Sequence, residues 1–121
     1  MAKFASDAVL DALLDAVAAG TILTVCSAQP TTRTEAVTTY ALADVVTDSG
    51  DFSKADGDTS GRKVTVGQQD NVPVDSSGTA THVAVCDGTD LLYVTTCTSQ
   101  VLTSGNTVTV PAWKIEVSDP S

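Results

Sequence analysis

The fold is decided by residues 79–98, TATHVAVCDGTDLLYVTTCT. β-Branched residues dominate both halves of this stretch, and the Asp-Gly-Thr-Asp sequence between them is typical of a tight turn. The pattern predicts a β-hairpin in which residues 79–86 pair with residues 91–98. In the simplest register Cys86 pairs with Leu91 and Cys97 lies opposite Ala80, so no disulfide is expected between the two cysteines.

Strand patterns continue on both sides of this hairpin. Val and Thr make up about 30% of the residues, and both favour a pleated sheet. Further strands are expected at residues 21–26, 37–46, 63–66, 72–74, 107–110 and 113–117, with an extended loop at 27–35 and a loop or short edge hairpin at 47–61. About eight strands at this spacing predict a mostly β fold, a single small β-sandwich or β-barrel domain over residues 21–121.

A helix is predicted in the N-terminal segment, residues 1–20. Ser6 or Asp7 is a suitable N-cap, Gly20 is a suitable stop, and apolar residues recur between them at helical spacing. These apolar positions are Val9, Leu10, Leu13, Leu14 and Val17. We expect residues 7–19 to form one amphipathic α-helix that buries this stripe against its own sheet or in a groove of a neighbouring protein. The spacing leaves both open, so the five residues are candidates for partner binding.

Three aspartates also share one face of the predicted helix. Asp7, Asp11 and Asp15 follow one another at intervals of four residues, which aligns their carboxylates. The face is either solvated or paired with basic side chains of a partner.

The charge of the chain excludes several classes of partner. Fifteen acidic residues against six basic ones give a net charge of −9, whereas binding to nucleic acid or to an anionic membrane requires clustered Lys and Arg. No apolar run approaches the roughly 18 residues of a membrane span, and no signal peptide is evident, so a soluble protein made in the cytoplasm is expected. The three cysteines, Cys26, Cys86 and Cys97, are odd in number and lack metal-site spacing, and we expect them to be reduced.

No residue pattern indicates catalysis or a cofactor. His82, the single histidine, lies inside a predicted strand without a partner motif, so a Cys–His nucleophile is not expected. Asp51, Asp56 and Asp58 gather in the 47–61 loop, but the glutamate that closes an EF-hand is missing, and we interpret them as an acidic turn. The sequence therefore predicts a non-enzymatic protein with no metal site and no cofactor.

Trp113 is the only tryptophan and begins the last predicted strand. A large aromatic group there is either an anchor of the core or an anchor of an interface. It is therefore the sixth candidate for partner binding.

Several stretches resemble small virion proteins of tailed bacteriophages. They are MAKFASDAVLDALLD at 1–15, CSAQPTT at 26–32, ADGDTSGRKVTV at 55–66 and THVAVCDGTDLLYVTTCTSQVLTSGNTVTVPAWKIEVSDP at 81–120. The resemblance covers nearly the whole chain and carries no catalytic or cofactor residues. It implies a structural component of a phage particle.

The resemblance leads us to expect a capsid decoration, or cement, protein that binds the major capsid protein or other virion proteins and stabilises the head. Such a protein would be found in the virion after assembly in the host cytoplasm, and a homo-oligomer, for example a trimer, would fit the symmetry of a shell. Three alternatives remain: a tail, tail-fibre or head–tail connector component, a small β-barrel enzyme or binding module, and a β-sandwich interaction module without a viral role.

Overall fold

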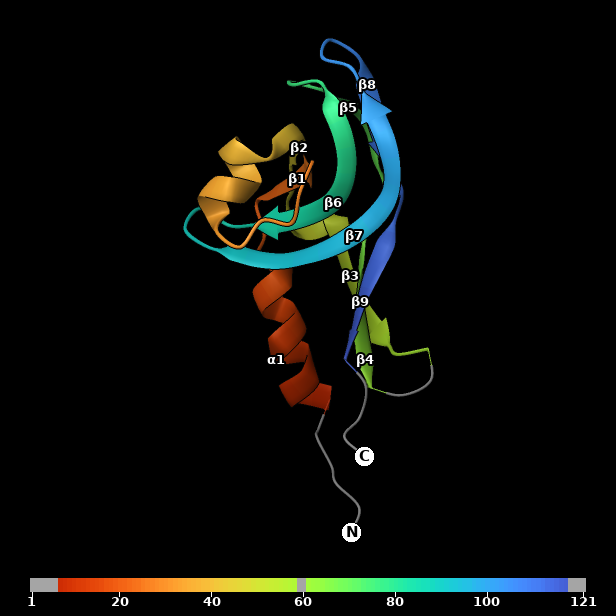
Figure 1. Cartoon of the computed structure of the whole chain (residues 1–121). Coiled ribbons are helices and arrows are strands. Elements are labelled where there is room, and N and C mark those ends of the chain that lie inside the picture. The colour runs from red at the N-terminus through yellow and green to blue at the C-terminus, as the bar shows by residue number, and fades with distance from the viewer. Residues whose placement is uncertain (1–6, 59–60, 118–121) are drawn as a thin grey trace.

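The computed structural model describes residues 7–58 and 61–117. One α-helix opens this part of the chain, and nine strands follow it, with two short helical turns between them (Figure 1). The helical elements are α1 (Asp7–Ala18), the π-helical turn η1 (Glu35–Thr39) and the 3₁₀ turn η2 (Ser49–Asp51). The strands are β1 (Ile22–Cys26), β2 (Ala41–Val46), β3 (Phe52–Asp56), β4 (Arg62–Val66), β5 (Gln69–Pro73), β6 (Gly78–Cys86), β7 (Leu91–Leu102), β8 (Thr107–Val110) and β9 (Trp113–Val117). The predicted fold class is confirmed: a small β-sandwich preceded by one helix.

The first sheet has four antiparallel strands in the order β2-β1-β6-β7. The central strand β1 is nearly all buried, as expected for Ile, Leu, Thr, Val and Cys in succession. The predicted hairpin is present as β6 and β7, and Cys86 pairs with Leu91 as expected. The strand β7 is longer than predicted and curves strongly around the molecule (Figure 1).

The remaining strands form a bent ribbon. β4 pairs with β9, and their continuations β5 and β8 also pair, so one long two-stranded ribbon runs through both small sheets. The ribbon is interrupted after Val66 and at Pro111, where proline cannot donate a ladder hydrogen bond. β3 adds an edge strand beside β4, and an isolated bridge between Ala43 and Val74 joins the ribbon to β2.

The main core fills the space between the four-stranded sheet and the ribbon. Buried side chains from both layers meet there, most of them valines. The largest fully buried members include Leu14, Leu23, Val64, Val66, Val72 and Val85. Because Leu14 belongs to α1, the helix is part of this core rather than an appendage to it.

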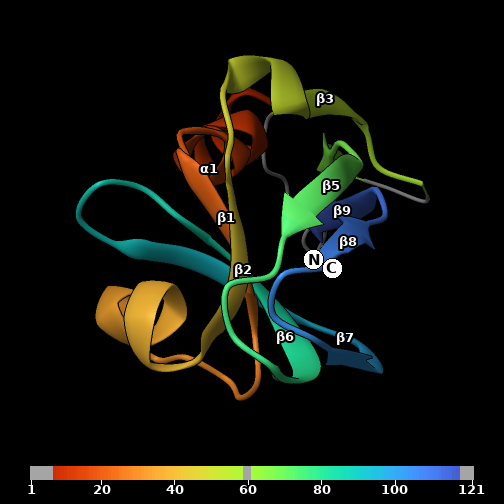
Figure 2. The same ribbon diagram turned by 90° about the horizontal axis from the view of Figure 1, so that it is seen from above.

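The other face of the first sheet is covered by η1 (Figure 2). Ala36 is fully buried there against Ala84 and Cys86. This corrects the prediction of a strand over residues 37–46, because only Ala41–Val46 is extended. The β-branched residues before Tyr40 adopt a π-helical turn, closed by the Tyr40 amide donating to the carbonyl of Glu35 at 2.8 Å, because this turn covers an otherwise exposed sheet face.

The strand pairing corrects one further expectation and decides between two alternatives. Ala80 lies opposite Gln100 rather than Cys97, since the register of β6 and β7 shifts twice, between Cys86 and Val85 and again between His82 and Ala80. The 47–61 segment contains a full strand, β3, which starts at the buried Phe52 and forms the edge hairpin that the sequence left as an alternative to a loop.

Candidate interaction surfaces

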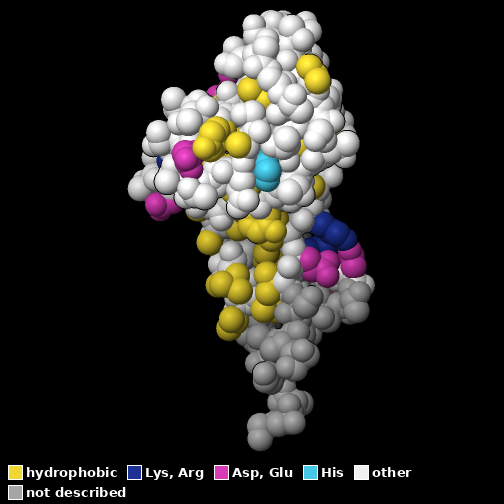
Figure 3. Space-filling view, in the orientation of Figure 1, with side chains coloured by type: hydrophobic (Ala, Val, Ile, Leu, Met, Phe, Trp, Pro, Cys, Tyr) yellow, Lys and Arg dark blue, Asp and Glu magenta, His cyan; other side chains and the backbone are white. Residues whose placement is uncertain are grey.

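Helix α1 is apolar on two faces. Leu10, Leu14 and Val17 are buried against the molecule's own strands, which answers the question of where much of the stripe packs. Val9 and Leu13 remain 57% and 56% exposed. The exposed face is completed by alanines, and its residues are Ala8, Val9, Ala12, Leu13 and Ala16. We call these five residues the outer helix face, and Figure 3 shows apolar side chains gathered along the helix below the sheet.

The acidic residues of α1 are paired within the molecule. Asp11 accepts a hydrogen bond from Nε of Arg62 on β4 at 2.8 Å, and Asp15 forms an ion pair with Lys54 on β3. Hydrogen bonding to Asp11, reinforced by Asp56 at 2.7 Å, raises the pKa of Arg62. The basic side chains that meet Asp11 and Asp15 therefore lie on the chain's own β3 and β4. The side chain of Asp7 lies outside the described residues.

The carboxylates of the 47–61 segment are also engaged. Asp58 pairs with Lys63 at 2.7 Å and with Lys114, whereas Asp56 pairs with Arg62. Asp51 accepts hydrogen bonds from the amide of Asp48 and from the side chain of Gln69. Within residues 7–58 and 61–117, no three His, Cys, Asp or Glu side chains are grouped to hold a metal ion.

The cysteines are held as neutral thiols. Cys26, Cys86 and Cys97 are free, and burial raises the pKa of each of them, which is the opposite of what a thiolate nucleophile requires. His82 lies across the ladder from Cys26 and shares a hydrogen bond of 2.8 Å with the hydroxyl of Thr81. The arrangement is that of strand residues satisfied by their neighbours.

Trp113 packs against the main core, at the beginning of β9. Its ring stacks on Tyr93 of β7 with centroids 5.9 Å apart. This contact joins the ribbon to the far edge of the first sheet. Trp113 is therefore placed as a core anchor, although its buried indole Nε1 has no hydrogen-bond partner among the described residues.

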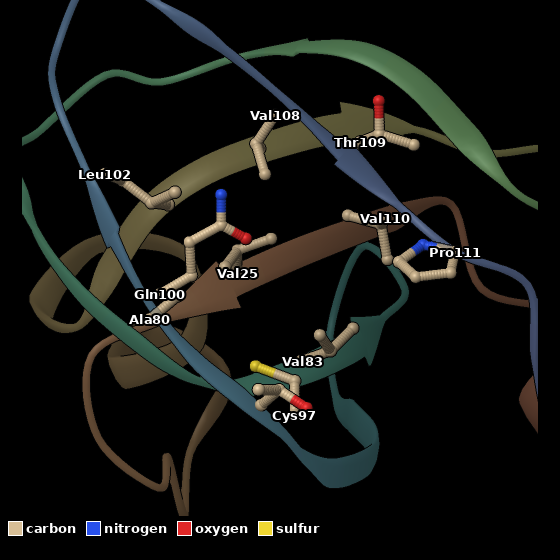
Figure 4. A pocket seen from close by; sticks show the side chains of 11 residues that line it. Val25, Ala80, Val83, Cys97, Gln100, Leu102, Val108, Thr109, Val110 and Pro111 are labelled. Atoms are coloured by element: carbon tan, nitrogen blue, oxygen red, sulfur yellow. The ribbon is translucent and has the colours of Figure 1, made fainter.

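A slot of about 200 Å³ opens between β7 and β8 (Figure 4). The two strands leave the turn at residues 103–106 and do not pair, so each has a free edge along the slot among the described strands. The buried Val25 and Val83 are among its lining residues, and its lining contains no charged residue. Beyond the slot, the Tyr93–Trp113 stack brings β7 and the ribbon together again. We call this opening the β7–β8 slot.

A second hollow, of about 510 Å³, is shallow and polar. It lies between the loop at residues 31–34 and the turn that joins β6 to β7. Arg33 stands in it, but its Nε already donates to the carbonyl of Asp87 at 2.7 Å. The guanidinium thus serves to fasten the loop to the turn.

The sequence identified only part of these surfaces. It singled out Val9 and Leu13, which are exposed, together with Leu10, Leu14, Val17 and Trp113, which the fold uses internally. It missed the alanines of the outer helix face, whose signal was available: Ala8, Ala12 and Ala16 repeat every four residues. The β7–β8 slot had no local signal, because it arises where two strands fail to pair.

None of the helices in the described part of the chain is long and apolar enough to cross a membrane. Comparison with protein-family models, with curated proteins and with solved structures found no match to this chain.

Proposed function

We propose that this chain is a structural protein of a tailed-phage virion, a capsid decoration (cement) protein that binds the head shell through protein–protein contacts. The observation that carries the proposal is the outer helix face. Apolar faces of a helix are normally covered, and of the two apolar faces of α1 only one is covered by the chain's own core. Residues 1–15 and 81–120 resemble small virion proteins. This resemblance supports the idea that another protein of a phage particle covers the outer helix face.

The outer helix face suits repeated attachment to a protein shell. Its small side chains allow close approach, and the pairing of Asp11 and Asp15 with Arg62 and Lys54 reduces the charge that docking would have to desolvate. One helix face contributes a modest interface. Many copies on a symmetric shell, or several helices in one oligomer, add such interfaces through multivalency.

The location in the particle is tested by quantitative mass spectrometry of purified virions separated into heads and tails. A decoration protein is expected in hundreds of copies in the head fraction. A few copies confined to the tail fraction would move the assignment to a tail, fibre or connector component. Absence from both fractions would refute a role in the virion.

The docking surface is tested by Leu13→Asp, which places a charge on the outer helix face without touching the core. We expect this variant to lose binding to shells that lack the protein by at least about tenfold, since desolvating a new carboxylate opposes docking. The matched control is Val46→Asp, because Val46 is 79% exposed and lies on β2. Equal binding by wild type and Leu13→Asp would show that another surface docks.

A further inference from the structure

The β7–β8 slot has the size and lining of a receptor for one large apolar side chain. Its volume of about 200 Å³ is below the ~300 Å³ at which small-molecule pockets begin. Valines and Leu102 line the interior, whereas uncharged Thr98, Gln100 and Thr109 stand at the exposed rim. The free edges of β7 and β8 offer backbone amides and carbonyls to whatever lies across the opening. An apolar side chain carried on an extended segment satisfies both features.

We propose that the slot of each molecule receives the side chain of Phe4 from a second copy of this chain. Outside the described residues lie 1–6, 59–60 and 118–121, and only residues 1–6, MAKFAS, contain large apolar side chains. The other phenylalanine, Phe52, is buried in the core. Leu13 is exposed but stands on a helix, and a helical cylinder of about 10 Å is too wide to enter a slot between two strands.

Charge favours the same occupant. Residues 1–6 contain Lys3 and no acidic residue, whereas the rest of the chain has five basic residues against fifteen acidic ones. A positively charged segment is therefore attracted to the acidic body of a second molecule. Four of the other basic residues, Lys54, Arg62, Lys63 and Lys114, form ion pairs within the fold.

The distance requires that the occupant come from another molecule. Phe4 precedes the first residue of α1, Asp7, by three positions, and three extended residues span at most about 11 Å. α1 alone is about 18 Å long, and its start lies at the opposite end of the molecule from β8 (Figure 1). Three residues therefore do not carry Phe4 from that end to the slot of the same molecule. The contact is then head-to-tail, and such contacts close into rings when their rotation allows it. This inference is independent of the proposed capsid role.

The experiment is sedimentation velocity of the purified full chain over a range of concentrations. Wild type is expected to associate reversibly, and Phe4→Ala is expected to weaken association by at least about tenfold through loss of the buried ring. Thr98→Lys, which places a cation at the slot rim, is expected to do the same. The matched control is Ser53→Lys, which makes the same charge change on the exposed edge strand β3 and should associate like wild type.

Mixing the variants identifies the two halves of the contact. Phe4→Ala retains an intact slot and Thr98→Lys retains an intact segment 1–6, so an equimolar mixture should form dimers and nothing larger. A wild type that stays monomeric overturns the proposal, as does association that Phe4→Ala leaves unchanged. Loss of association with Phe4→Ala but not with Thr98→Lys would show that residues 1–6 bind outside the slot and overturn the proposal. Alkylation of Cys97 in wild-type oligomers as fast as in Phe4→Ala would show that Phe4 does not fill the slot, and would overturn it too.

Discussion

Cys97 is the one thiol that solvent reaches. It lines the β7–β8 slot and is half-buried, whereas Cys26 and Cys86 are completely buried. Because thiolate is the reactive form and burial raises the pKa of Cys97, alkylation at neutral pH should be selective but slower than for a free thiol.

We therefore expect iodoacetamide to give a single adduct at Cys97. The rate should still rise with pH above the range in which an ordinary thiol ionises. Peptide mapping by mass spectrometry after a timed reaction checks this. Modification of Cys26 or Cys86 at a comparable rate in the folded protein would contradict the packing described for the first sheet.

Asp44 is a carboxylate in an unfavourable position. Partial burial on β2 raises its pKa, and the nearby charge of Asp75 adds to the effect. The folded state therefore holds the Asp44 proton more tightly than the unfolded state does. The contribution of Asp44 to stability is fully present below its pKa in the unfolded state and is lost as pH rises through its pKa in the folded state.

Asp44→Asn removes that penalty. We expect the variant to unfold at a higher temperature than wild type at pH 7, with the difference disappearing near pH 3 where Asp44 is protonated in both states. Asp70→Asn is the matched control, because it makes the same charge change at an exposed residue and keeps the oxygen that accepts from Gln68. Thermal melts of the three proteins between pH 3 and pH 7 test the expectation, and a difference that does not depend on pH would refute it.

At the scale of the element, α1 offers a test of its two faces with neighbouring residues of the same type. Leu14 is 1% exposed and belongs to the main core, whereas Leu13 is 56% exposed. Leu14→Ala is expected to lower the free energy of unfolding by about 2–5 kcal/mol, since it leaves a cavity. Leu13→Ala is expected to change it by less than about 0.5 kcal/mol. Urea denaturation measures both, and equal losses would mean that α1 is rotated about its axis.

The extent of α1 could be predicted from the sequence, but its orientation could not. Apolar spacing and Gly20 fix where the helix begins and ends, and the close approach of Gly20 to Val85, where an added Cβ would lie 2.4 Å from a methyl group, explains why glycine stands there. Because both faces are apolar, periodicity does not tell which one is buried. That choice depends on strands that are distant in the sequence.

Residues 35–39 show where local propensity fails. The Val-Thr-Thr sequence favours a strand, but strand propensities are worth at most about 1 kcal/mol per residue. Burial of Ala36 against Ala84 and Cys86, on the outer face of the first sheet, outweighs them. The hairpin of β6 and β7 was predictable because its turn is local. The two register shifts that move Cys97 away from Ala80 were not, since they accompany the curvature of β7 around the molecule.

For the whole molecule, the chain should require its helix. α1 contributes three buried apolar side chains, those of Leu10, Leu14 and Val17. Truncation of one buried side chain of this kind to alanine costs up to about 5 kcal/mol of stability. Their joint loss is comparable to the total stability of about 5–15 kcal/mol of a small domain. A chain that lacks residues 1–19 is therefore expected to lose cooperative unfolding and dispersed amide NMR signals. A truncated chain that keeps both would show that the β-sheets are stable alone.

The order of the strands has a consequence for how the protein is made. β1 pairs with β6, and β4 pairs with β9, so each sheet joins an early strand to a late one. While the ribosome is still adding β6 to β9, the emerging chain holds β1 and β4 without these neighbours. Pairings between distant segments also form slowly, over milliseconds to seconds. Folding is thus completed after β9 has left the ribosome, and the apolar strands made first depend on chaperones or on low concentration until then.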